Sequence, residues 1–288
     1  MPASKIKSYG DVSRVELDRR AFRKKQSKKS ALISCVSLIA FASAIYLLLS
    51  NSTGWEKVRI AFFSPEYFLD ALPVVFEGLL KNLQILIFAA SGVAVLATLI
   101  AVVRTSRSAV LFPLRVLASV YTDIFRGLPM IIILYLIGFG IPGLRIFGRI
   151  DAGLLGTIAI IIGYSAYVAE VIRAGIEAIH PSQRAAARSL GLSHSQTMRI
   201  IILPQAIRKV VPALMNDFVS MQKDVGLVSV LGVIDAVRSA QIMVAKTYNF
   251  TPYIAAGLLF ILLSLPFIRL TDWYTAKLRK REQMEGAV

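Results

Sequence analysis

The sequence predicts an all-α polytopic membrane protein with about six transmembrane helices. Three observations support this fold class. Hydrophobic residues make up 56% of the 288 residues and charged residues only 17%, whereas soluble domains contain roughly 25% charged residues. The apolar residues gather in runs of about 20 residues, the length that crosses a bilayer. The lysines and arginines are concentrated in alternate connecting segments, as expected of a chain that crosses a membrane repeatedly.

The first 50 residues predict a basic tail followed by one span. Residues 1–30 contain ten Lys/Arg, three acidic residues and no large apolar face, so we expect a cytoplasmic tail that is mostly disordered or lies on the membrane surface. Residues 31–50 form an uncharged apolar run of about one bilayer thickness. A signal peptide is the alternative, but the basic region is long for one and no clear small-residue cleavage site is present. The single cysteine, Cys35, lies in this run and excludes an intrachain disulfide.

Five further spans follow a predicted interfacial loop over residues 51–72. These spans are residues 73–103, 116–140, 153–176, 204–222 and 252–271. The first of them is long and is expected to tilt or to begin outside the hydrocarbon. The span 116–140 is interrupted at Arg126-Gly127-Leu128-Pro129, which a membrane tolerates when neighbouring helices satisfy the backbone. Residues 223–251 are expected to touch the membrane without crossing it.

The distribution of basic residues orients these spans. Segments 1–30, 104–115, 173–209 and 269–288 together hold twenty-four Lys/Arg, whereas the loops 51–72, 141–152 and 236–251 hold six. Because loops rich in Lys/Arg remain in the cytoplasm, both termini and the segment 183–204 are predicted to be cytoplasmic. The same distribution accounts for most of the net charge of +16 without nucleic acid as a partner.

Residues 183–204 predict two short helices joined at a glycine. The three alanines 185–187 favour a helix, which Gly191 can end by adopting positive φ. Ser193 is a good N-cap for a second short helix, and Pro204 suits the first turn of the next span. A DNA-reading helix-turn-helix is an alternative, but it needs a soluble domain and this segment lies between spans. An ordinary loop is the other alternative.

Four segments of the chain carry recognisable motifs. Gly191 is preceded by Ala186-Ala187 and followed, after nine residues, by Ile201-Ile202-Leu203-Pro204. The other segments are Tyr121-Thr122-Asp123-Ile124-Phe125-Arg126-Gly127-Leu128-Pro129, Ala166-Tyr167-Val168-Ala169-Glu170-Val171-Ile172-Arg173-Ala174-Gly175-Ile176 and Lys223-Asp224-Val225-Gly226-Leu227-Val228-Ser229-Val230. The first resembles the EAA loop of ATP-binding-cassette (ABC) importer permeases, and the others resemble segments of the polar amino acid (His/Glu/Gln/Arg-type) family of these permeases. The resemblance covers residues 73–280.

The resemblance implies a type I ABC importer transmembrane domain with a cytoplasmic coupling helix. It implies a permease subunit for polar amino acids or related small amine-containing solutes, in the bacterial cytoplasmic (inner) membrane. The implied partners are an ABC ATPase dimer, a second permease subunit in a homodimer or heterodimer, an extracytoplasmic solute-binding protein and membrane lipid. The sequence contains no Gly-x-x-x-x-Gly-Lys-Ser/Thr loop, so the chain is not expected to be an enzyme or to bind a cofactor. ATP and Mg²⁺ are expected on the partner ATPase.

Two departures from the family pattern bear on coupling and topology. Ala185 stands where the motif has its glutamate, and residues 1–50 add a tail and one span to the usual five. Contact with the ATPase is therefore expected from the rest of the loop, with Arg184, Arg188, Leu190 and Leu192 making the docking contacts. The predicted coupling residues are Arg184, Ala186, Ala187, Arg188, Leu190, Gly191 and Leu192.

Polar groups inside spans predict the solute path, because an ionised group costs about 2.5–3.5 kcal/mol at the membrane centre and therefore usually faces a cavity or a partner. The resemblance places solute contacts on the spans that contain Glu170, Asn216, Asp217 and Ser220. Asn216 and Ser220 share a helix face, whereas Asp217 points about 100° away. Acidic groups there would attract an ammonium group or a cationic side chain.

Each acidic residue also has a structural alternative. Glu170 could form a salt bridge to Arg173 or Arg126, and Asp217 could have an interhelical or subunit-interface partner. Lys223 and Asp224 follow the span 204–222 and are expected to pair locally or to gate, not to bind solute.

Two other functional classes, an ion-coupled secondary transporter and a membrane enzyme, would show features that this sequence lacks. An ion-coupled secondary transporter typically shows internal repeats, and none is evident. A membrane enzyme requires a reactive group of side chains in a span. The two histidines, His180 and His194, both lie in the cytoplasmic loop without carboxylate or cysteine ligands at metal spacing. The sequence does not predict which amino acid is carried.

Overall fold

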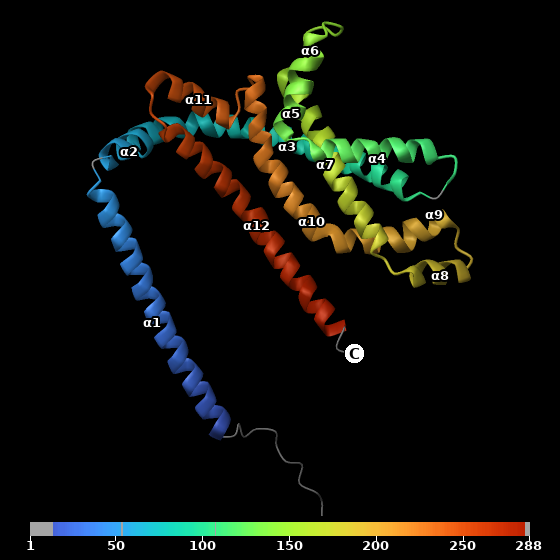
Figure 1. The fold of residues 1–288 in the computed structure, drawn as a ribbon, viewed down its shortest axis with the longest axis horizontal. Coiled ribbons are helices and arrows are strands. Elements are labelled where there is room, and N and C mark those ends of the chain that lie inside the picture. Colours follow the sequence, from blue (N-terminus) through green and yellow to red (C-terminus); the bar gives the residue numbers. More distant parts are fainter. Residues whose placement is uncertain (1–13, 53, 107, 286–288) are drawn as a thin grey trace, which may run out of the picture. The chain divides into compact units, whose positions relative to one another are not determined.

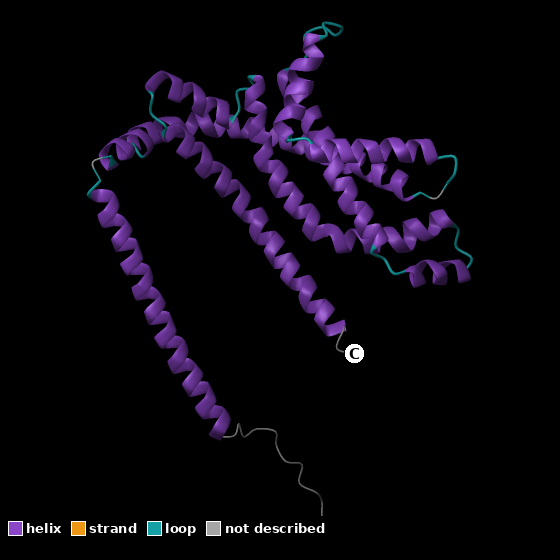
Figure 2. Cartoon of the chain, in the orientation of Figure 1, coloured by secondary structure: helices purple, strands orange, loops and turns teal. Residues whose placement is uncertain are grey.

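The computed structural model describes residues 14–52, 54–106 and 108–285, and every regular element in these ranges is helical (Figures 1 and 2). The elements are α1 (Arg14–Ser50), α2 (Trp55–Phe62), α3 (Pro65–Thr105), α4 (Phe112–Gly127), α5 (Met130–Tyr135), the π-helix η1 (Leu136–Gly140), α6 (Ile141–Gly143), α7 (Ala152–Glu177), α8 (Pro181–Ser189), α9 (His194–Gln196), the π-helix η2 (Thr197–Ile202), α10 (Leu203–Asp224), the 3₁₀-helix η3 (Val225–Leu231), α11 (Ala236–Thr247) and α12 (Thr251–Glu285). This confirms the all-α fold class.

The chain divides into two compact units, the first ending at Ile60 and the second beginning at Ala61. In the first unit, α1 is one unbroken helix that contains the predicted span 31–50. Residues 14–30, for which the sequence predicts mostly disorder or a surface position, form the first half of this helix. No Gly or Pro interrupts residues 14–50, and the Lys, Arg, Gln, Leu and Ala residues there favour helix. The rest of the predicted tail, residues 1–13, lies outside the described residues.

The described residues contain up to six membrane spans. Four candidate spans are helical stretches that are long and apolar enough to cross a bilayer: Phe22–Ser50 in α1, Trp55–Thr105 with α2 and α3, Ala152–Glu177 (α7) and Thr251–Leu278 in α12. Two more consist of bent helix pairs: α4 with α5–α6, bent by 109°, and the helix from His194 to Leu231 with α11, bent by 50°. The sharper bend lies at the predicted interruption, where Pro129 disfavours a helical conformation of Leu128, which is extended.

Two predicted boundaries are wrong. Most of the predicted interfacial loop 51–72 is helical, because it contains α2 and the start of α3, which begins at Pro65 and includes Pro73 in its interior. The helix of the fifth predicted span begins at His194 instead of Pro204, since α9, η2 and α10 are continuous. The physical reason lies in η2, where the Leu203 N–H donates to the carbonyl of Met198, five residues back. This wider π turn carries the helix past Pro204, which cannot donate a backbone hydrogen bond.

The core of the second unit is built around α7, which packs against α3, α10 and α4. A second apolar cluster joins α3 to α11 and α12, with Val75, Ala236 and Ala255 fully buried. The helices approach closely there because Gly78 has no side chain: a Cβ on Gly78 would lie 2.5 Å from the backbone nitrogen of Ala236. Small residues therefore set the spacing between α3 and α11.

A buried polar joint fixes the same contact. Asp235 is fully buried and N-caps α11 by accepting a hydrogen bond from the Arg238 N–H at 2.8 Å. The Asn82 amide of α3 donates to Asp235 at 2.9 Å and accepts from the Ala236 N–H at 3.0 Å. Since buried polar groups are costly to leave unpaired, this set of bonds specifies where α11 lies along α3.

Candidate functional site

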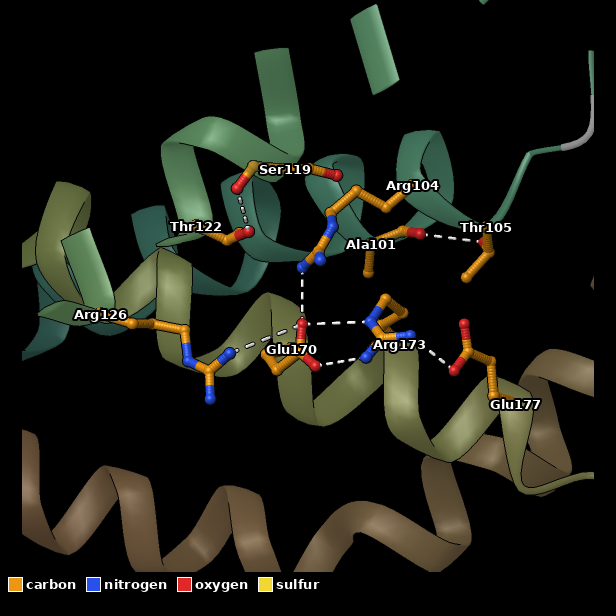
Figure 3. Close-up of polar contacts among 9 residues, drawn as sticks. All are labelled: Ala101, Arg104, Thr105, Ser119, Thr122, Arg126, Glu170, Arg173 and Glu177. Carbon is orange, nitrogen blue, oxygen red and sulfur yellow. Dashed lines mark hydrogen bonds and ion pairs between the residues drawn. The ribbon is translucent and has the colours of Figure 1, made fainter. Parts of the chain in front are cut away.

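Glu170 lies at the centre of a charged cluster that joins three helices (Figure 3). Its Oε2 atom is 2.6 Å from Arg104 Nη1 of α3 and 3.8 Å from Arg126 Nη1 of α4. Arg173, one turn along α7, donates to both Glu170 oxygens and also to Glu177. The structure therefore contains both ion pairs that the sequence offers as the alternative for Glu170, to Arg173 and to Arg126, together with one to Arg104.

The Glu170 cluster is well shielded at its centre. The side chains of Arg104 and Glu170 are only 12% and 19% exposed, whereas that of Arg126 is 42% exposed. Three guanidinium groups surround one carboxylate, which already receives charge-assisted hydrogen bonds, the strong kind. The Glu170 carboxylate therefore binds arginines of α3, α4 and α7 and holds these helices together.

The predicted solute-path residues on α10 separate into two faces. Asn216 and Ser220 are both exposed in the chain, as expected for residues one turn apart. Asp217 is half-buried, and its Oδ2 atom is buried with no hydrogen-bond partner among the described residues. This orphaned carboxylate oxygen inside a span indicates either a ligand or a partner that the single chain does not supply.

Asp224, which the sequence predicts to pair locally or to gate, shares the Asp217 face, and Tyr164 of α7, which the sequence did not indicate, packs against it. Asp224 lies two turns after Asp217 and so on the same face of α10. It accepts a hydrogen bond of 2.8 Å from the Tyr164 hydroxyl of α7. Asp224 forms no ion pair with Lys223 among the described residues, contrary to the expected local pairing. The spacing of seven residues between Asp217 and Asp224 indicates in the sequence that they share a helix face. The contact of Asp224 with Tyr164 arises only from the packing of α10 on α7.

The segment 183–204, which the sequence predicts to be cytoplasmic, lies mostly in a hairpin formed by α8, α9 and η2. Gly191 adopts φ +76°, and the Leu192 N–H returns to the carbonyl of Ala187 at 3.1 Å, so the predicted glycine turn is present. Ser193 and Gln196 form a reciprocal capping box at the start of α9, as the predicted N-cap requires. Ala187 is fully buried against the hairpin, whereas Ala186 is exposed.

Two cationic side chains donate to carbonyls at the end of α7, one from the hairpin and one from α10. Arg184 donates to the carbonyl of Ile176 at 3.2 Å, and Lys209 of α10 donates to the carbonyl of Ala178 at the same distance. Arg184 therefore ties the hairpin to α7, which carries Glu170, and η2 continues directly into α10, which carries Asp217.

The predicted docking residues face two directions. Leu190, at the hairpin tip, is 78% exposed. Arg184, Arg188 and Leu192 instead line a hollow of about 420 Å³ between α8 and η2. The hairpin thus presents an apolar tip beside a basic recess.

Comparisons with known proteins agree with this architecture. Residues 94–280 match the family described as Binding-protein-dependent transport system inner membrane component. The chain is 35% identical over 198 residues to the arginine transport system permease protein ArtQ of Bacillus subtilis (strain 168), covering 68% of this chain and 89% of that protein. It is 33% identical over 212 residues to the probable glutamine ABC transporter permease protein GlnM of the same organism, covering 73% and 96%.

Solved structures show the same fold. A crystal structure of an amino acid ABC transporter with histidines matches with a TM-score of 0.67 and 35% identity, covering 74% of this chain and 98% of that chain. An inward-facing structure of the MetNI methionine ABC transporter matches with a TM-score of 0.58 and 18% identity, covering 70% and 95%. The second likeness concerns the fold alone.

Proposed function

The chain belongs to the family of inner membrane components of binding-protein-dependent transport systems, and we propose that the Asp217 face of α10 lines its solute path and that the α8–α9 hairpin contacts its ATPase. The relatives and the fold make the chain a permease subunit of an amino acid ABC transporter. They favour this function over an ion-coupled secondary transporter. Such a permease works with an ATPase, a solute-binding protein and another permease subunit.

The finer assignments follow from the sequence and remain proposals. The chain has no phosphate-binding Gly-x-x-x-x-Gly-Lys-Ser/Thr loop, so ATP and Mg²⁺ bind only the partner ATPase dimer. The permease pairs as a homodimer or a heterodimer in the bacterial cytoplasmic membrane. The charge distribution supports a cytoplasmic position for both termini.

The observation that carries the solute path is the orphaned Asp217 oxygen. Asp217 and Asp224 place two carboxylates on one face of a spanning helix, beside the Tyr164 hydroxyl. Carboxylates in a span attract an ammonium or guanidinium group, so a cationic amino acid is the best match. The name of the arginine permease relative agrees with this class. Asn216 and Ser220, on the adjacent exposed face, would contact the solute where the second permease subunit completes the path. Glu170, by contrast, positions α3, α4 and α7.

The test is uptake by the complete transporter in proteoliposomes, with binding protein and ATPase present. Asp217→Asn should lower uptake of a cationic amino acid by about tenfold or more, since a hydrogen bond to a charged group contributes about 1.5–3 kcal/mol. Asp272→Asn, which changes an exposed carboxylate on α12, is the matched control and should transport normally. Unchanged uptake in Asp217→Asn and in Asn216→Ala would contradict the proposed path.

A further inference from the structure

We propose that the hollow of the α8–α9 hairpin receives a carboxylate side chain of the partner ATPase. This inference rests on the proposed function of the hairpin as the ATPase contact and specifies the chemistry of that contact. In this contact the acidic side chain belongs to the ATPase. The permease does not supply it, because Ala185 stands where the permease motif has its glutamate.

The hairpin is basic and has no acid of its own. No Asp or Glu occurs between Glu177 and Asp217. The same stretch contains five cationic residues, Arg184, Arg188, Arg199, Arg208 and Lys209, and both histidines of the chain. Neither Arg184 nor Arg188 forms an ion pair with any described residue. Among the described residues, the charge of Arg184 and Arg188 is therefore available to an acidic partner.

Two residues that line the hollow carry buried polar atoms without partners. Arg184 Nε and Thr197 Oγ1 are both buried without a hydrogen bond among the described residues, and Thr197 as a whole is only 5% exposed. Arg184, Arg188, His194 and Thr197 line the hollow together. Guanidinium and hydroxyl groups are hydrogen-bond donors, and a carboxylate accepts bonds from an arginine in a paired, charge-assisted geometry.

The apolar lining favours a protein side chain over a free anion. Leu192 and Met198 form part of the wall of the hollow, which can pack against the methylene groups of a glutamate. The volume of about 420 Å³ exceeds the size of a single carboxylate group. Leu190 beside it is exposed and apolar, so a polypeptide surface can cover the tip and fill the recess in one contact.

Binding of the ATPase subunit to the full permease in detergent tests this proposal. Arg188→Gln should weaken binding by about tenfold, because the buried carboxylate of the ATPase then lacks a positively charged partner. Binding by the unchanged permease should also weaken as salt is raised, and the substitution should remove most of that dependence. Arg188→Lys should restore part of the affinity by restoring the charge without the paired geometry.

Arg199→Gln provides a matched control. Arg199 lies in the same hairpin and is exposed, so its loss changes the net charge equally but leaves the hollow intact. Its expected effect is less than twofold. Equal losses in Arg188→Gln and Arg199→Gln would show a diffuse charge effect and overturn the proposal, as would unchanged binding in Arg188→Gln.

A third variant separates this inference from the proposed function. Leu190→Asp alters the exposed tip and should weaken binding whether or not the hollow is occupied. If Leu190→Asp weakens binding and Arg188→Gln does not, only the carboxylate contact is wrong. If both variants bind the ATPase normally, the hairpin is not the ATPase contact and both proposals fail.

Discussion

Glu170 joins three helices through one side chain, so loss of one of its ion-pair partners should lower stability more than loss of a partner from an exposed pair. We expect Arg104→Met to destabilise the permease by about 1–3 kcal/mol, because it removes a charge-assisted bond to a shielded carboxylate. The remaining pairs to Arg173 and Arg126 limit the loss. Thermal unfolding in detergent provides the measurement.

Arg59→Met is the matched comparison, since Arg59 also pairs with a glutamate. The side chains of Arg59 and Glu56 are 59% and 63% exposed, and exposed pairs contribute about 0–1 kcal/mol. Arg59→Met should therefore shift the melting temperature little. Equal shifts in the two variants would mean that shielding does not strengthen the Glu170 cluster.

At the scale of elements, Gly191 determines the geometry of the hairpin. An alanine at φ +76° costs roughly 1–2 kcal/mol, so Gly191→Ala should loosen the turn between α8 and α9. Amide hydrogen exchange over residues 185–196 should accelerate by about five- to thirtyfold if this loss appears as local opening. Gly257→Ala is the control, because Gly257 lies in α12 at negative φ with no atom near a new Cβ. Similar exchange in the hairpins of both variants would argue against strain at Gly191.

The hairpin also shows why some elements could be predicted and others could not. Its glycine turn and Ser193 cap follow from local chemistry, and the sequence predicts both. The π turn of η2 does not follow from local chemistry, because it redirects hydrogen bonds around Pro204 within a longer helix. The same distinction applies to the site: Asp217 is a polar residue in an apolar run, whereas Tyr164 joins it only through packing of α7 against α10. The pairing of Arg104 with Glu170 likewise spans 66 residues and leaves no local pattern.

At the scale of the whole molecule, α1 is an additional span before the family region, and its removal tests whether the remaining spans insert into the membrane without it. The family match begins at residue 94, and the compact unit from Ala61 onward contains its own buried core. Deleting residues 2–50 removes the first predicted span and leaves five. The basic segments 104–115, 173–209 and 269–288 are retained, so they should still direct the remaining spans correctly. We therefore expect this variant to bind the ATPase and to transport solute.

Deleting only residues 2–30 should be more harmful than the longer deletion. It keeps the apolar span 31–50 but removes all ten Lys/Arg from its N-terminal side, while Lys57 and Arg59 remain on its C-terminal side. The charge balance across this span is then reversed, which favours insertion in the opposite orientation and conflicts with the spans that follow. The yield of permease that co-purifies with ATPase, normalised to total chain, should fall for this variant and not for the 2–50 deletion. If the basic residues of the tail do not orient α1, the two deletion variants should give equal yields. If charge alone determines the orientation, replacing the tail with a different basic sequence should restore assembly.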